Sequence, residues 1–162
     1  MVRDKYRLVE AWLGTASRNL RTAKEHAGFE NWGESIQLSY ECIDLSARSA
    51  LVLLDVDFPE DHRWTYSGMS GIAKQVRQGG LLTRLDANLV DIPRLLLLAN
   101  FWGQFYLPVN YGYDNYSLAP PQDLFGEAEA KLAQQHALEA YGTASNLASL
   151  SDRRIESLLA KN

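Results

Sequence analysis

An imidazole and a guanidinium stand next to each other at His62 and Arg63, shortly after Pro59. Both groups donate hydrogen bonds to anionic oxygens, so the pair is a candidate binding site for a phosphate or a nucleotide. A structural interpretation competes with this one, in which His62 caps a helix or anchors the loop that follows the proline. The sequence leaves both interpretations open.

An acid and a base stand four residues apart at Asp44 and Arg48. With the acid first, this spacing favours an ion pair along one helix face, and we predict that structural role. If the pair instead faces a groove beside a later helix, Arg48 joins Arg94 and His62 around an anion. Arg48 and Arg94 are therefore also candidate ligand-binding residues.

Tyrosines gather in and beside residues 107–121, a segment rich in Pro, Gly, Asn and Asp that is predicted to be an ordered loop. Tyr111 and Tyr113 are candidate ligand-binding residues there, with Tyr106 and Tyr116 on either side, since an aromatic ring can stack on any nucleobase. The alternative is that these rings pack the loop onto the core while their hydroxyls stay hydrogen-bonded.

Other kinds of chemistry are disfavoured by what the sequence lacks. It contains no Gly-rich phosphate loop, no paired-histidine metal motif and no serine or cysteine triad pattern, so we expect no metal and no cofactor. The single cysteine, Cys42, lies in an apolar helical pattern and is predicted to be buried. A formal net charge of -4 excludes a broad electropositive face, so any contact with nucleic acid must be local.

Apolar residues recur at steps of three and four, the period of one helix face, over most of the chain. The pattern predicts long helices over residues 4–27, 32–54 and 81–104, and a further one with an alanine stripe between residues 130 and 147. Asp91 and Pro93 can interrupt the third of these helices and start a new segment. Short helices are expected near residues 72–77 and, as an accessory tail, over 151–161.

These elements predict an all-α fold, an up-and-down antiparallel bundle of about four to six helices that forms a single domain over residues 1–162. An alanine stripe lets two helices approach closely, which places its helix in the middle of the bundle or at a subunit contact. The charged beginning of the chain does not resemble a signal peptide, and the most apolar stretch, residues 95–105, is shorter than the roughly 20 residues that cross a bilayer. We therefore expect a cytoplasmic protein without membrane contact.

The segment YECIDLSARSALVLLDVDFPEDHRW resembles the central signature of the HEPN family, named for nucleotide binding in higher eukaryotes and prokaryotes. Asp44 and Arg48 match its acid and base, residues 50–54 its apolar run, and Pro59 and His62 its ending. The segments WLGTASRNLRTAKEH and YGYDNYSLAPPQDLFGEAEAKLAQQHALEAY are similar to the opening and closing sections of the family, so the resemblance covers most of the chain.

The resemblance implies a helical bundle that forms a homodimer, often beside a small nucleotidyltransferase, and in several branches a ribonuclease toxin. Those ribonucleases use an arginine and a histidine about four to six residues apart, on or near a later helix. Arg94 lies in the matching region, but no histidine follows it before His136, which we predict to be partly buried and structural. Arg21 and His26 have the spacing, yet a five-residue step separates them by about 140° around a helix, so we interpret that match as coincidence.

We therefore predict a non-catalytic HEPN-type binding and interaction module, a homodimer that binds a nucleotide or another anion and pairs with a nucleotidyltransferase. Exposed parts of Trp12, Trp32 or Trp102 would suit the dimer interface, and the alternative is that all three belong to the core. The alternative is an enzyme, a divergent and toxin-like ribonuclease that uses Arg94 with His62 or with a loop tyrosine. Convergence of Arg94 and a histidine in one cleft would favour the enzyme.

Overall fold

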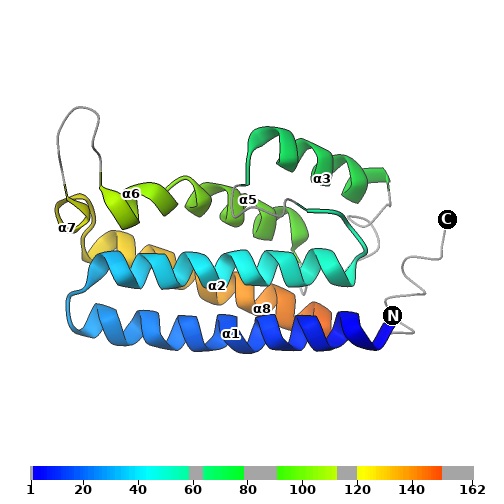
Figure 1. The fold of residues 1–162 in the computed structure, drawn as a ribbon, viewed down its shortest axis with the longest axis horizontal. Helices are drawn as coiled ribbons and strands as arrows, with labels where there is room; N and C mark the ends of the chain where they lie inside the picture. Colours follow the sequence, from blue (N-terminus) through cyan, green and yellow to red (C-terminus); the bar gives the residue numbers. More distant parts are fainter. Residues whose placement is uncertain (1, 59–63, 79–90, 113–119, 151–162) are drawn as a thin grey trace.

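Long helices form the body of the protein in the computed structural model, which describes residues 2–58, 64–78, 91–112 and 120–150. The long helices are α1 (Val2–Gly28), α2 (Trp32–Leu53), α5 (Ile92–Gly103) and α8 (Glu127–Ala148), and shorter ones are α3 (Tyr66–Gln78), α6 (Tyr106–Tyr111) and α7 (Pro121–Leu124) (Figure 1). No strand occurs in the described ranges. The predicted all-α bundle is confirmed.

Helix α2 lies at the centre of the bundle. It packs against α1, α8, α5 and α6, while α8 also contacts α1 and α5. In Figure 1, α2 and α8 run in one direction and α1 and α5 in the other, so successive long helices alternate in direction. The parallel helices α2 and α8 therefore form a central pair, which α1 and α5 flank.

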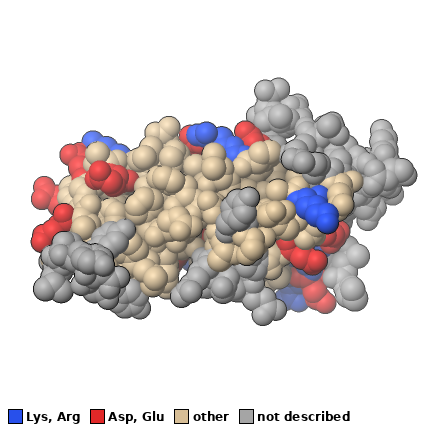
Figure 2. All heavy atoms as spheres, turned by 90° about the horizontal axis from the view of Figure 1, so that it is seen from above, with Lys and Arg blue, Asp and Glu red and all other residues tan. Residues whose placement is uncertain are grey.

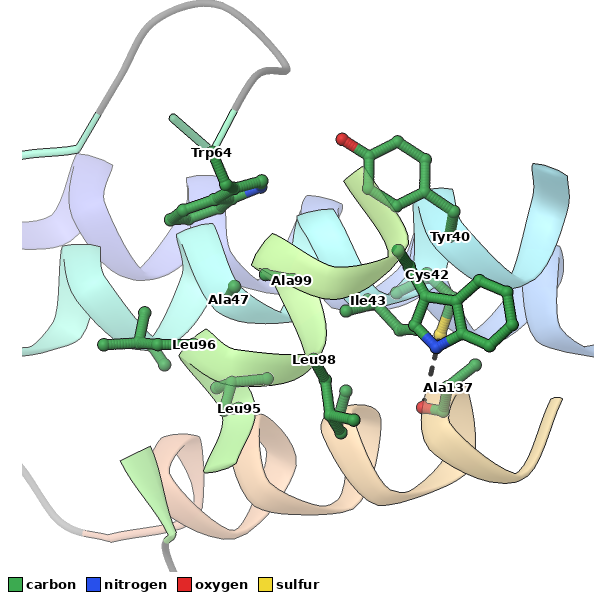
Figure 3. Close-up of a cluster of buried hydrophobic side chains, with 14 of the residues drawn as sticks. Tyr40, Cys42, Ile43, Ala47, Trp64, Leu95, Leu96, Leu98, Ala99 and Ala137 are labelled. Carbon is green, nitrogen blue, oxygen red and sulfur yellow. Dashed lines mark hydrogen bonds between the residues drawn. The ribbon is translucent and has the colours of Figure 1, made fainter. Parts of the chain in front are cut away.

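Small side chains allow α2 and α8 to pack closely along what we call the α2–α8 seam. Cys42 Sγ donates a hydrogen bond of 3.7 Å to the carbonyl oxygen of Ala137 across this seam (Figure 3). Gln134 Nε2 donates to Ser35 Oγ at 2.9 Å nearer the start of both helices. The buried seam residues repeat at steps of three and four: Ser35, Ser39, Cys42, Ser46 and Ser49 on α2, and Ala130, Ala133, Ala137, Ala140 and Ala144 on α8. The alanine stripe thus faces the interior, one of the two positions predicted for it.

Cys42 is fully buried in this seam, as predicted. Burial raises the pKa of its thiol to about 12, although a hydrogen bond with Ser46 opposes the shift. The thiol therefore stays protonated and acts as a weak donor inside the core.

The start of α5 shows where the predicted helix over residues 81–104 is interrupted. Asp91 lies outside the helix, and its Oδ1 accepts a hydrogen bond from the backbone nitrogen of Arg94 at 2.9 Å. Pro93 follows in the first turn, where its missing N–H costs nothing. Of the two predicted alternatives, an uninterrupted helix and a new segment that starts at Asp91 and Pro93, the structure confirms the second; residues 79–90 lie outside the described ranges.

Two predictions change in the structure. Residues 106–111 form α6, not the predicted loop, because Pro108 stands in a first turn that tolerates proline. Helix α3 is longer than the predicted residues 72–77 and includes Gly68 and Gly71. The rest of the tyrosine-rich segment, residues 113–119, and the predicted tail helix lie outside the described ranges. Among the helices described, none is both long and apolar enough to cross a bilayer.

Candidate functional site

Asp44 is the centre of a buried polar cluster on α2. Its Oδ2 accepts a hydrogen bond of 2.9 Å from Arg48 Nε, and its Oδ1 accepts one of 2.8 Å from Trp64 Nε1. Asp44 and Arg48 are only 2% and 6% exposed. Because a buried carboxylate needs donors to replace its lost hydration, these contacts fix Trp64 against α2.

Arg48 lies between this carboxylate and two aromatic rings. Its Cζ atom is 5.3 Å from the ring centre of Phe58 and 5.9 Å from that of Trp64. Cations are attracted to the faces of aromatic rings, so these contacts add to the ion pair with Asp44. An anion in solvent would reach Arg48 only if the cluster opened.

Arg94 connects α5 to α8 at the surface. Its Nε and Nη2 atoms both donate to Glu139 Oε2, at 2.8 and 2.6 Å. The two side chains are 50% and 34% exposed, so the pair stabilises the fold by about 1 kcal/mol or less. The Glu139 carboxylate nevertheless neutralises the Arg94 guanidinium and occupies the Nε and Nη2 donors that a phosphate bound to Arg94 would use.

His136 lies near this ion pair on α8, and its imidazole is held from α5. Trp102 Nε1 donates a hydrogen bond of 3.0 Å to His136 Nδ1. Burial lowers the pKa of His136 below its usual value; the charge of Glu139 opposes this shift, and the charge of Arg94 adds to it. Since an indole N–H can only donate, Nδ1 is the acceptor and the neutral ring carries its proton on Nε2.

Arg94, His136 and Glu139, which we call the α5–α8 cluster, therefore come together from two helices. A general base needs a free lone pair, but Nδ1 is engaged by Trp102 and Nε2 carries the proton. A general acid needs the doubly protonated ring, whose second proton would stand on Nδ1 opposite the Trp102 donor. In this geometry His136 neither removes nor supplies a proton.

A groove of about 610 Å³ opens between α3, α5 and α6. Figure 2 views this side of the molecule and shows a wide uncharged surface across its middle. Among the residues that the structure describes, those that line the groove are neither acidic nor basic: Trp64, Thr65, Met69, Leu97, Asn100, Gly103, Gln104, Tyr106 and Leu107. The groove therefore suits an uncharged group.

The side chains of several predicted site residues lie outside the part of the chain that the structure describes. His62, Arg63 and Tyr113 lie outside the described residues, and for Tyr111 only the backbone, at the end of α6, is described. His26 is half-buried near the end of α1, and its Nδ1 has no hydrogen-bond partner. Of the predicted site residues, Asp44 and Arg48 form an ion pair with each other, whereas Arg94 forms its ion pair with Glu139.

The tryptophans predicted to suit the dimer interface differ in exposure. Trp102 is only 3% exposed, and its ring centre lies 5.2 Å from that of Phe101 and 5.6 Å from that of Phe105. Of the two roles left open for it, interface and core, the structure shows the core. Trp12 and Trp32 are half-buried; Trp32 packs on the core, and the ring centre of Trp12 lies 6.2 Å from that of Phe58.

Sequence reasoning missed three residues that organise these clusters: Trp64, Trp102 and Glu139. Trp64 directly follows Arg63, and Glu139 stands one helical turn after His136, so both were close to residues already singled out. Nothing in the sequence pairs Trp102 with His136, which come from different helices. Within the described ranges, no three His, Cys, Asp or Glu side chains are grouped closely enough to hold a metal ion.

Comparison with known proteins gives one match. A family model described as HEPN domain matches residues 9–153, which is most of the chain. No curated protein matches the sequence, and no solved structure matches the fold.

Proposed function

The chain belongs to the HEPN domain family, and on this premise we propose that it is a binding and interaction module that does not cleave RNA. Membership of the family implies a role related to nucleotides or RNA. The family includes ribonucleases, so the absence of cleavage has to be argued from the residues of this chain.

The main support for a module that does not cleave RNA is the hydrogen bond from Trp102 Nε1 to His136 Nδ1. His136 is the histidine that the described fold brings near Arg94, and this bond takes away its use as an acid or a base. Glu139 also occupies the guanidinium of Arg94. A ribonuclease would need both groups free to contact the scissile phosphate and its neighbouring hydroxyl.

We also propose that the module forms a homodimer through the flank where α5 and α8 meet. Phe101 and Leu132 are 43% and 42% exposed. Phe101 directly precedes Trp102, and Leu132 stands one helical turn before His136, so both flank the α5–α8 cluster. Exposed apolar side chains beside a charged rim are typical of interfaces, and a twofold axis at this flank would pair the same side chains of two copies.

The dimer is tested by measuring molar mass in solution for the wild type and for Phe101→Glu. The charged variant is expected to shift the protein to monomer, because an unpaired carboxylate would be buried in the interface. Leu138→Glu is the matched control, since Leu138 is 53% exposed but lies about 120° from Leu132 around α8. A wild-type monomer, or a dimer that persists in Phe101→Glu, would contradict the proposed interface.

For the anion we propose His62 and Arg63, with Tyr111 and Tyr113 as stacking residues, and we propose a nucleotidyltransferase as the partner protein. Arg48 and Arg94 are engaged by Asp44 and Glu139, which favours the pair outside the described ranges. The expected result is that Arg63→Ala weakens binding of a nucleotide without affecting the bundle.

The alternative, a divergent ribonuclease, uses Arg94 with His62 or with a loop tyrosine. Its support is that the Arg94 side chain is half-exposed and would be free once Glu139 released it. Cleavage of labelled RNA by the wild type, compared with Arg94→Ala, separates the two functions.

A further inference from the structure

We propose that the groove between α3, α5 and α6 binds a neutral aromatic base that bears an exocyclic amine, such as the base of adenosine. The proposal rests on the nucleotide-related function above and specifies which part of the ligand is recognised and where. The groove has no described lining residue in common with the pair proposed for the dimer flank, Phe101 and Leu132.

The described side chains around the groove carry no charge. The lining residues for which side chains are described include no acid and no base, and the described surface across the middle of Figure 2 is largely uncharged. A phosphate placed there would lose its hydration without gaining a cation, which is unfavourable. The group inside the groove must therefore be uncharged, and any phosphate attached to it must point outwards.

The groove also offers two hydrogen-bond acceptors, the amide oxygens of Asn100 and Gln104. Asn100 Nδ2 donates to the carbonyl oxygen of Trp64 at 2.6 Å, and Gln104 Nε2 donates to the carbonyl oxygen of Asn100 at 3.4 Å. These bonds fix the orientation of both amides and direct their nitrogens to the backbone. Neither amide oxygen accepts a hydrogen bond within the described part of the chain, so both are available to N–H groups of a ligand.

The spacing of these two acceptors limits the kinds of ligand that fit the groove. Asn100 and Gln104 are four residues apart, so both face the groove from the same side of α5. Each side chain offers a free acceptor oxygen and the second N–H of its amide, so the pair fits a group whose N–H hydrogens stand beside a ring nitrogen that accepts. An exocyclic amine on an aromatic base presents two such hydrogens.

The walls explain why the ligand should be aromatic. Met69, Leu97 and Leu107 supply apolar surface, while Tyr106, which is 37% exposed, supplies the accessible ring, because Trp64 is only 2% exposed. Leu97 and Leu107 are 61% and 51% exposed, an unusual cost for large apolar side chains unless something covers them. The volume of about 610 Å³ is within the range of about 300–1,000 Å³ that is common for small-molecule sites.

Titration calorimetry with adenosine and purine riboside tests the proposal, because these nucleosides differ only in the exocyclic amine. Adenosine is expected to bind the full chain with one site per copy, and purine riboside at least about tenfold more weakly, as expected when buried acceptors are left without donors. Gln104→Leu should weaken adenosine by about the same factor. Gln135→Leu, an exposed glutamine of α8 outside the groove, should leave binding unchanged.

Three results would overturn the proposal: no binding of adenosine at millimolar concentration, equal binding of purine riboside, or adenosine binding that is unaffected by Gln104→Leu. Ribose 5-phosphate serves to separate this failure from failure of the proposed function. If it binds and adenosine does not, the groove is rejected while a phosphate site elsewhere, and with it the nucleotide-related role, remains supported.

Discussion

Trp102 on α5 donates a 3.0 Å hydrogen bond to His136 on α8, and this one contact fixes which imidazole nitrogen carries the proton. In the neutral ring the bond occupies Nδ1 and leaves an N–H donor at Nε2, while burial lowers the pKa of the imidazole. Arg94 lies close enough to lower the pKa of the same ring, yet its guanidinium is held by Glu139. The arrangement resembles a catalytic pair in composition, and the hydrogen bonds of both members join α5 to α8.

The lowered pKa of His136 predicts a loss of stability in mildly acidic solution. The unfolded chain takes up a proton near the ordinary value of 6.5, whereas the folded state does so only at lower pH. The stabilisation is therefore complete above about pH 6.5 and is lost as the pH falls from there through the folded-state pKa. Urea unfolding between pH 7.5 and 5 should show this decline in the wild type and a smaller one in His136→Asn. An equal decline in both would contradict the assignment.

The Asp44–Arg48–Trp64 cluster predicts strong coupling between buried polar groups. Arg48→Met removes one partner of a buried ion pair and should lower the free energy of unfolding by about 3–5 kcal/mol. Asp44→Leu combined with Arg48→Met should cost less than the sum of the single changes, because no charge then remains unpaired. Urea unfolding of the four proteins measures the coupling. Additive effects would mean that the two side chains act independently.

The α2–α8 seam predicts that size matters more than polarity at its centre. Ala137→Leu adds side-chain atoms where Cys42 contacts the Ala137 backbone, so it should destabilise the fold by about 1–3 kcal/mol. Ser49→Ala, on the same face of α2, is the control: the Ser49 hydroxyl is buried and has no hydrogen-bond partner among the described residues, so its removal should be neutral or stabilising. Thermal unfolding compares the two variants, and a well-tolerated leucine would show that the seam is loosely packed.

The carboxyl of Glu129 leads us to expect a second loss of stability, at a more acidic pH. Its Oε2 accepts a hydrogen bond of 2.9 Å from the backbone nitrogen of Gly126, at the start of α8, and this bond lowers the pKa of the carboxyl below 4.5. The stabilisation is therefore present above about pH 4.5 and is lost as the pH falls through the folded-state pKa. Glu129→Gln keeps an acceptor for the same backbone nitrogen but cannot titrate. Its unfolding free energy should change less than that of the wild type between pH 5.5 and 3.

The helices could be predicted from the sequence because their cause is local. The three- and four-residue spacing of apolar residues predicts α1, α2 and α8 to within a few residues, and the capping chemistry of Asp91 marks the start of α5. Helix α6 was missed because its sequence contains Pro108 and turn-forming residues, while its stability comes from packing on α2. Local propensity does not report such tertiary contacts.

The clusters around Asp44 and His136 were only half predictable, for a related reason. The Asp44–Arg48 pair follows from its four-residue spacing on one helix. The donors from Trp64 and Trp102 come from segments 20 and 34 residues away, so their arrival depends on how the helices pack. The groove likewise exists only because α3, α5 and α6 meet, and no sequence motif marks it.

Cleavage of labelled RNA by the purified full chain, beside Arg94→Ala and His136→Asn, tests the central claim most directly. The account predicts that the wild type releases no product that depends on Arg94, so all three proteins should give the same trace. A matched control with Lys131→Ala, an exposed basic residue of α8, accounts for nonspecific effects of lost charge. RNA cleavage by the wild type and by Lys131→Ala that disappears in Arg94→Ala would contradict the non-cleaving function.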